Sequence, residues 1–338
     1  MSSVTSAFGQ QYHFGYGRVG VLQQELLTTQ DIDKLLLARD EGQLMKALTD
    51  VKLSRHVEYT LDPHRFIESL ERWLRNEVRS MTPPEKQDIF DILWLRGDAP
   101  LLSYLLKKHH GLTSSISTEP SVGATAFEPG ELRRLVQSGV AGQLPEDVAT
   151  FVAHIKALPS LPLPQTIDTA VFQFIVDRQK SLATKSGSSA VRQYVAHHID
   201  LTNIRTSRRL HENDTPADHL LSGGEIPVEA FSLSPAQLAA AVRHSSLPNS
   251  VIDQIALATD STESSVELER GLARAIAHDL AVMRDQTLSI EPIFAFAAVA
   301  LSQFKVLRTI IIGKSTHLSA DEIRKLLPPY LSASPFAS

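Results

Sequence analysis

Apolar residues recur along most of the chain at the three- and four-residue spacing of one helix face. A clear stripe consists of Ile67, Leu70, Trp73, Leu74 and Val78. Stripes of this kind are typical of amphipathic helices, whereas a half-buried strand would alternate with a period of two. Alternation of that kind over a strand length is scarce. The pattern therefore predicts an all-α protein.

Polar stretches rich in Gly, Pro and Ser interrupt the apolar segments at residues 113–130, 184–190 and 211–227. We expect loops there, because Gly and Pro end regular elements. Elsewhere a charged helix, a short breaker and an apolar helix follow one another three times. These predicted pairs are residues 66–80 with 89–95, 170–182 with 190–197, and 268–283 with 292–301.

The chain also resembles itself at a spacing of about one hundred residues. Residues 32–44 match residues 132–144 at an offset of 100, and a weaker third copy starts at Leu238. In a second register, Asp98, Asp200 and Gln303 follow one another at offsets of 102 and 103. Each of the three is followed four residues later by an aliphatic residue, namely Leu102, Ile204 or Leu307.

Repeats of a fixed period are the signature of stacked units that bury their helix faces against each other. We therefore predict three helical units, residues 1–126, 127–227 and 228–338. We expect them to form one compact chain and not independent domains.

Composition excludes several classes of function. The 338 residues are 43% hydrophobic and 21% charged, with a formal net charge of −5 and no cysteine. This balance is typical of a globular protein. Nucleic acid is a disfavoured partner, because proteins that bind it usually carry a basic excess. The absence of cysteine excludes disulfides, thiolate zinc sites and a cysteine nucleophile.

The sequence predicts a soluble, cytoplasmic protein. Its first residues lack the basic start and apolar core of a signal peptide. The most apolar stretch, residues 292–301, is about half the ~20 residues that a membrane-spanning helix needs.

Two glycine motifs resemble nucleotide-binding loops. Gly15, Gly17 and Gly20 fit Gly-x-Gly-x-x-Gly, but a dinucleotide site needs a strand before this motif, and no aliphatic run precedes it. We interpret it as a flexible lead into the first helix. The residues from Gly313 to Thr316 resemble the end of a phosphate loop, but position 308 is Arg where that loop needs Gly. We predict that Gly313 closes a helix instead.

The thirteen histidines raise the alternative of a metal-dependent enzyme. Without thiolates, a metal site would need imidazoles and carboxylates brought together by the fold. The richest cluster is His211, Glu212, Asp214, Asp218 and His219. A solvated polar loop is the commoner outcome of such a composition.

Three blocks of sequence carry a family resemblance. The C-terminal block contains the pairs Leu307-Arg308 and Gly313-Lys314, the middle block contains Asp200, Asn203 and Arg205 followed by Gly223-Gly224, and Arg18-Val19 follows Tyr16 near the N-terminus. In this order the chain resembles the C-type subunits of the bacterial and archaeal V/A-type rotary ATPases, which are the counterparts of the d-type subunits in eukaryotes, over about residues 14–327. Val306 departs from the family's Asn, and the first unit keeps Asp98 without the Asn that follows.

The resemblance implies a three-lobed, pseudo-threefold helical funnel without catalytic residues, cofactor or metal. A single copy would sit on the membrane-embedded proteolipid c-ring, formed by the L/K proteolipid, and receive the D and F subunits of the central stalk. It would transmit torque for ATP-coupled proton or sodium transport. Contact with the membrane would run through the ring, without direct lipid insertion. The alternative is a generic α-helical scaffold or regulatory protein outside the rotary ATPases.

The candidate site residues are those shared between repeats or with the family pattern: Asp98, Asp200, Asn203, Arg205, Arg308 and Lys314. One interpretation places them at the cavity, in contact with the shaft or the ring. The other is internal to each repeat, with Asp capping a helix and Arg pairing between helices. Capping is the commoner role of such residues, and we favour the second interpretation.

Overall fold

The computed structural model describes residues 12–58, 60–112, 119–120, 124–158, 162–208, 219–249, 251–253 and 262–327. Helices and turns make up this part of the chain, and no strand occurs in it. The all-α prediction is therefore confirmed. The chain divides into two compact units, which are described separately below. Unit 1 comprises residues 1–87, 188–194 and 247–338, and unit 2 comprises residues 88–187 and 195–246.

The helices follow the predicted pattern of long segments joined by short connections. Unit 1 contains α2 (His13–Leu22), α3 (Thr29–Leu37), α4 (Glu41–Asp50), α5 (Pro63–Ser80), α13 (Thr262–Arg284), α14 (Glu291–Ser315) and α15 (Ala320–Leu326). Unit 2 contains α6 (Asp91–His109), α7 (Pro129–Ser138), α8 (Glu146–Lys156), α9 (Pro164–Ser186), α11 (Pro235–Arg243) and most of α10 (Ser189–Ser207). Short 3-10 turns are η1 (Gln23–Glu25), η2 (Lys52–His56), η3 (Pro84–Phe90) and η5 (Val228–Ser232).

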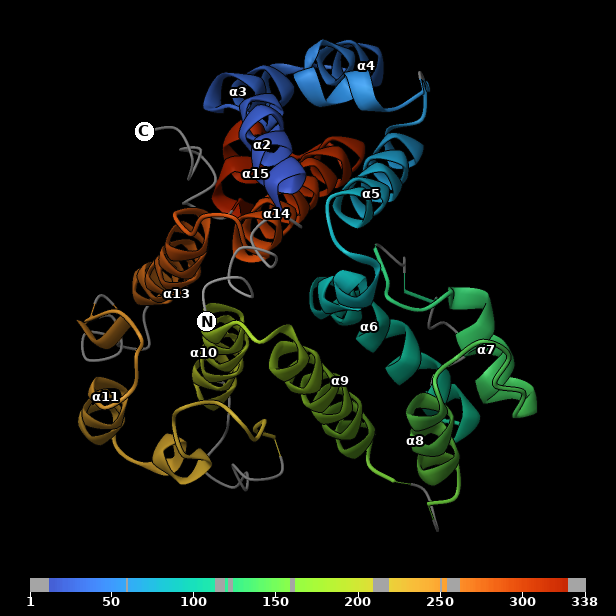
Figure 1. The fold of residues 1–338 in the computed structure, drawn as a ribbon, viewed down its shortest axis with the longest axis vertical. Helices are drawn as coiled ribbons and strands as arrows, with labels where there is room; N and C mark the ends of the chain where they lie inside the picture. Colours follow the sequence, from blue (N-terminus) through green and yellow to red (C-terminus); the bar gives the residue numbers. More distant parts are fainter. Residues whose placement is uncertain are drawn as a thin grey trace, which may run out of the picture. The chain divides into compact units, whose positions relative to one another are not determined.

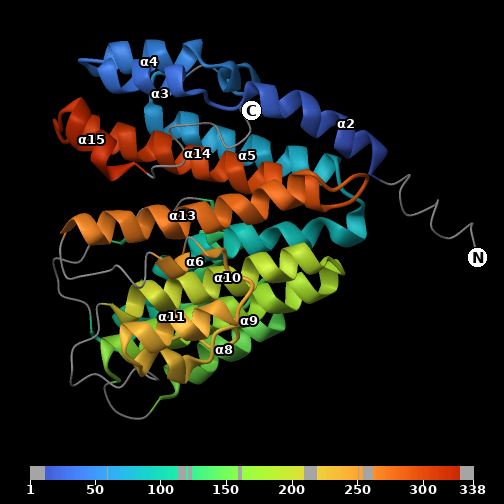
Figure 2. The ribbon, with the colours of Figure 1, turned by 90° about the vertical axis from the view of Figure 1, so that its left-hand side faces the viewer.

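Helix α14 is the core of unit 1. Figures 1 and 2 show it running alongside α5 and α13, and it also packs against α2, α4 and α15. Every residue from Pro292 to Leu301 is buried. The 25-residue helix is long and apolar enough to cross a membrane, but 72% of its most apolar stretch is buried inside the structure. Its composition is therefore that of a core helix surrounded by other helices.

Helix α5 buries the apolar face that the sequence predicts. Its buried residues include Ile67, Leu70, Leu74 and Val78, and this face packs against α14. The helix begins where Asp62 accepts hydrogen bonds from two backbone N–H groups of the first turn, while proline occupies the first helical position. Both features favour helix initiation, because the first N–H groups have no partner within the helix.

Unit 2 is built around α6, which packs against α9 and carries α7 and α8 (Figure 1). Apolar residues of these four helices form one buried cluster. The predicted loop at residues 184–190 is shorter than expected. Only Gly187 and Ser188 separate α9 from α10, because Gly187 takes the left-handed conformation, with φ of 76°, that ends a helix within one residue.

Both glycine motifs lie inside helices. The Gly15–Gly20 motif belongs to α2, so it is neither the turn of a dinucleotide site nor a flexible lead into a helix. Gly313 does not end α14, and that prediction is wrong: the helix continues to Ser315, and the left-handed residue is His317, with φ of 61°. The reason for Gly313 is close packing, because a Cβ there would lie 2.6 Å from Cγ1 of Ile323 in α15.

Candidate functional site

Asp98 is a fully buried carboxylate in the middle of α6. Its Oδ2 accepts a hydrogen bond from the backbone N–H of Ala126 at 2.8 Å, and its Oδ1 accepts one from Phe127 at 3.2 Å. These two residues precede Glu128, the residue before α7. A buried carboxylate is costly unless hydrogen bonds compensate it, and bonds from backbone N–H groups to a charged oxygen are among the stronger ones. Asp98 therefore clamps the start of the α7–α8 pair onto α6.

Asp200 makes the same arrangement on α10. It is also fully buried, and its Oδ2 and Oδ1 accept from the N–H groups of Glu225 and Ile226 at 2.9 and 3.2 Å. The bonded residues precede η5 and α11. Gly224 lies so close that a Cβ on it would be 1.9 Å from Asp200 Oδ1. The carboxylate and this glycine together fix how the chain passes over α10.

Gln303 forms the third clamp of the series, on α14. Its Oε1 accepts from the N–H of Leu27 at 2.7 Å, and its Nε2 donates to the Leu27 carbonyl at 3.1 Å. Leu27 is two residues before α3. An amide can donate and accept at once, so this clamp satisfies both backbone groups of one residue. It joins positions that are 276 residues apart in the chain.

The three clamps give the sequence register a structural meaning. Each of the long helices α6, α10 and α14 carries one polar side chain that is hydrogen-bonded to the backbone of another segment. In each case that segment leads into short helices. In the third case those short helices, α3 and α4, belong to the beginning of the chain. The N-terminal segment therefore packs with α14, the last of the three long helices. The division into residues 1–126, 127–227 and 228–338 stays a prediction.

Asn203 and Arg205 lie further along α10. The buried Asn203 side chain accepts from the N–H of Leu221 and donates to its carbonyl, both at 2.8 Å. This two-point bond has the same form as that of Gln303 with Leu27. Arg205 is half-buried and lies two positions beyond Asn203. Asp200 and Asn203 therefore hold successive parts of one segment, residues 221–226.

Arg308 and Lys314 tie α14 to the N-terminal helices of unit 1. A terminal nitrogen of Arg308 lies 3.0 Å from Oε1 of Glu71 on α5. The Lys314 ammonium donates to the carbonyl of Leu36, in the last turn of α3. A cation is favourable there, because the end of a helix carries unpaired carbonyls and partial negative charge.

One polar cluster was not predicted from the sequence. Next to Asp200, the fully buried His197 has Nε2 2.8 Å from the Ser246 hydroxyl and 4.0 Å from a Glu225 carboxylate oxygen. Glu225 in turn accepts from the N–H of Ser246 at 2.6 Å. Burial, and to a smaller extent the Glu225 charge, raises the pKa of Asp200 from 3.8 to about 6. The two backbone hydrogen bonds and the nearby His197 lower this pKa, but by less than burial raises it. The sequence offers one sign of this cluster: His197 and Asp200 lie at positions i and i+3, on the same face of a helix.

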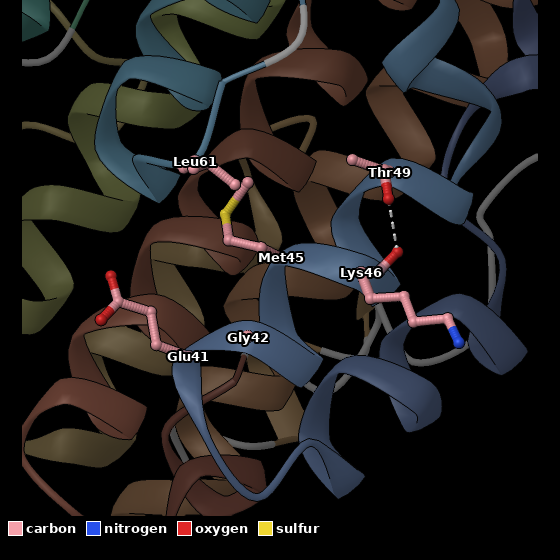
Figure 3. A pocket seen from close by; sticks show the side chains of 6 residues that line it. All are labelled: Glu41, Gly42, Met45, Lys46, Thr49 and Leu61. Atoms are coloured by element: carbon pink, nitrogen blue, oxygen red, sulfur yellow. Dashed lines mark hydrogen bonds between the residues drawn. The ribbon is translucent and has the colours of Figure 1, made fainter.

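A surface pocket and the grouping of potential metal-binding side chains bear on the alternative of an enzyme. Figure 3 shows a surface pocket in unit 1 lined by α4 and Leu61, in which the charged ends of Glu41 and Lys46 point away from Met45. The Thr49 hydroxyl in it donates to the Lys46 carbonyl at 2.7 Å. No group of three potential metal-binding side chains occurs among the described residues.

Of the proposed histidine-rich cluster, only His219 lies within the described residues. Its other members, between residues 211 and 218, lie outside them. The metal-dependent alternative therefore gains no geometric support from the part of the chain described here.

Comparison with known families identifies the class of protein. Residues 16–326 match the ATP synthase (C/AC39) subunit family. The match spans nearly the whole chain, so the chain belongs to this family and is one of the subunits of a V/A-type ATP synthase. A search among curated proteins gave no match. The family resemblance seen in the sequence is confirmed, and a scaffold outside the rotary ATPases is set aside.

Proposed function

We propose that this chain is a non-catalytic rotor adaptor, which links the D and F subunits of the central stalk to the proteolipid c-ring and transmits torque between them. The observation that carries the proposal is the family match over residues 16–326. A single copy would be present in each complex. We expect the protein to lie at the cytoplasmic side of the membrane and to reach it through the ring.

Stiffness is the property that this role demands, and the clamps supply it. Three long helices are each fixed to a distant backbone segment by a buried polar side chain. Removing one partner of such a bond leaves a buried group unpaired, at a cost of about 1–3 kcal/mol, so each clamp resists opening. A helical core at crystal-like packing density also transmits strain with little compression.

The candidate site residues divide by accessibility. Asp98, Asp200 and Asn203 are buried and bonded to backbone within the chain. We therefore infer that they maintain the repeat and do not touch the shaft or the ring. Arg308 and Lys314 also have partners within unit 1. The role of Arg205, half-buried on α10, stays a prediction.

Clamps at corresponding positions of three long helices support a pseudo-threefold arrangement. Such a chain can offer similar contacts around an axis, which suits an adaptor seated on a ring and holding a shaft. The burial of α14 inside unit 1 fits contact with the ring without lipid insertion. We propose the three-unit funnel on these grounds.

The test is deletion of this chain from its host complex. We expect the head to keep hydrolysing ATP while ion transport driven by that hydrolysis is lost, because the torque no longer reaches the ring. The composition of the purified complex is verified by mass spectrometry. Retained ion transport by complexes shown to lack the chain would refute the adaptor role.

A further inference from the structure

A small cavity lies in unit 2 where α6, α9 and α10 meet, next to the segment that Asn203 holds. Its volume is about 180 Å³. A dry protein cavity of about 150 Å³ is large enough to bind benzene. The interior of the cavity is formed by buried apolar side chains: Ala99, Ile175, Val176, Ile199 and Leu221. The space therefore suits an apolar group of the size of one aromatic ring.

The polar residues of the cavity are the more exposed ones. Arg96, His198 and Thr202 line it and are half-buried, and Phe172, which also lines it, is 43% exposed. Gln179, the buried polar residue in the lining, donates its amide to the Ile92 carbonyl at 2.6 Å. The cavity thus combines an apolar interior with a polar rim on its solvent side.

The rim carries hydrogen-bond donors and a positive charge. A terminal nitrogen of Arg96 lies 2.8 Å from Nδ1 of His198. A guanidinium can only donate, so Nδ1 is the acceptor, and the imidazole is neutral with its proton on Nε2. The guanidinium has five N–H groups, which enables it to bind an anion as well as His198. None of the described residues that line the cavity carries a carboxylate.

The pair of Arg96 and His198 is not part of the clamp that the long helices share. Both residues stand two positions before the clamping aspartate of their helix, Asp98 or Asp200. The corresponding position on α14, two before Gln303, is Leu301, which is apolar. A clamp therefore forms without a polar residue at this position, and the polar rim is a feature of the cavity in unit 2.

We propose that this cavity binds a small amphipathic carboxylate, a monoanion whose apolar body has about six to eight carbons. The body occupies the space between Ile175, Val176 and Ile199, and the carboxylate accepts hydrogen bonds from the Arg96 guanidinium at the rim. This binding site does not depend on the adaptor role proposed above.

The two parts of the ligand make separate contributions. Removal of the apolar body from water supplies affinity without regard to charge. Hydrogen bonds between a guanidinium and a carboxylate are stronger than those between neutral groups, and a half-buried site screens them less than open water does. A carboxylate should therefore bind at least about tenfold more tightly than an alcohol of the same shape.

The experiment compares para-fluorobenzoate with para-fluorobenzyl alcohol, each titrated into the full chain and followed by fluorine NMR. We expect the benzoate to bind with a Kd at least about tenfold lower than that of the alcohol. Intermolecular nuclear Overhauser effects should connect its ring protons to the methyl groups of Ile175, Val176 and Ile199, which locates the ligand in the cavity. Absence of benzoate binding up to about 10 mM, equal affinity for the alcohol, or contacts only to methyl groups elsewhere would each overturn the proposal.

Two arginine variants assign the charge that selects the carboxylate. Arg96→Gln should raise the Kd of the benzoate at least about tenfold and leave that of the alcohol nearly unchanged. Arg192→Gln is the matched control, because Arg192 is an exposed arginine on α10 outside the cavity lining, and it should change neither Kd. Circular dichroism verifies that both variants are folded. Unchanged benzoate affinity in folded Arg96→Gln would refute the assignment, and if that variant does not fold, the ligand pair and the methyl contacts in the unmodified chain decide.

Discussion

Asp98 and Asp200, 102 residues apart, each accept hydrogen bonds from two successive backbone N–H groups with nearly the same geometry. The distances are 2.8 and 3.2 Å at Asp98 and 2.9 and 3.2 Å at Asp200. Two buried carboxylates that bind the same kind of backbone group in the same order point to a repeated structural unit. Gln303 extends the series with a neutral side chain, which binds the backbone of Leu27 on both sides.

Replacing Asp98 by Ala should destabilise the protein by about 2–4 kcal/mol, because a buried and a part-buried N–H group lose their partner together. The measurement is the midpoint of urea unfolding together with exchange of the Ala126 and Phe127 amides. Asp50→Ala is the matched control, since Asp50 is exposed at the end of α4, and it should change stability by less than about 0.5 kcal/mol. Equal effects of the two substitutions would show that the hydrogen bonds of Asp98 add no measurable free energy of unfolding.

Gln303→Ala should loosen the N-terminal segment of unit 1 from α14. The substitution leaves both backbone groups of Leu27 unpaired and buried, so we expect a loss of about 2–3 kcal/mol. Limited proteolysis with protein sequencing should then show faster cleavage near residues 23–28 than in the unmodified chain. Ser302→Ala, which removes only a bond from a side chain to its own helix, is the control and should leave the cleavage rate unchanged. Unaltered cleavage in Gln303→Ala would contradict a clamp at this position.

Gly224→Ala should be strongly destabilising, because the new methyl group would overlap Asp200 Oδ1. We expect a loss of about 1–3 kcal/mol, as for other additions to a filled site. Gly17→Ala is the opposite case: apart from the adjoining backbone of its own helix, no heavy atom lies within 4 Å of its Cβ position, and alanine favours the helix by about 1 kcal/mol. Thermal unfolding should therefore shift in opposite directions for the two variants. A shift in the same direction would refute the close approach at Gly224.

Stability should also carry a pH signature from Asp200. Its folded pKa of about 6 lies above the ordinary 3.8, so the folded state binds the proton more tightly and the contribution to stability falls as the pH rises through 6. Relative to Asp200→Asn, the unmodified chain should lose roughly 1 kcal/mol of unfolding free energy between pH 5 and pH 7.5. Urea unfolding of both proteins at the two pH values measures the difference. A gain over that range would mean that the two backbone bonds outweigh burial.

The fold class and the register of the clamps could be predicted from the sequence. Helical periodicity reports directly which face of α5 is buried, and Asp98, Asp200 and Gln303 recur at a nearly constant offset. What these side chains bind could not be predicted. Their partners are backbone groups, which leave no trace in side-chain identity, and the bond between Gln303 and Leu27 spans 276 residues.

Two local features could not be predicted from the sequence, namely the role of Gly313 and the polar cluster around His197. Glycine is common at helix ends, which favours that interpretation of Gly313, but glycine equally serves where a neighbouring helix approaches, as Ile323 does here. The sequence shows the cluster around His197 only through the i, i+3 spacing of His197 and Asp200, because its other members Glu225 and Ser246 are distant in sequence. Tertiary packing decides both cases.

The most direct test of the adaptor role is to mix the purified chain with the co-expressed D–F pair of the same organism and to measure the mass of the eluting species by light scattering. We predict a complex with one copy of each of the three chains. Separate elution of the chain and the D–F pair, at concentrations well above those in the cell, would contradict a direct link between this protein and the rotating shaft.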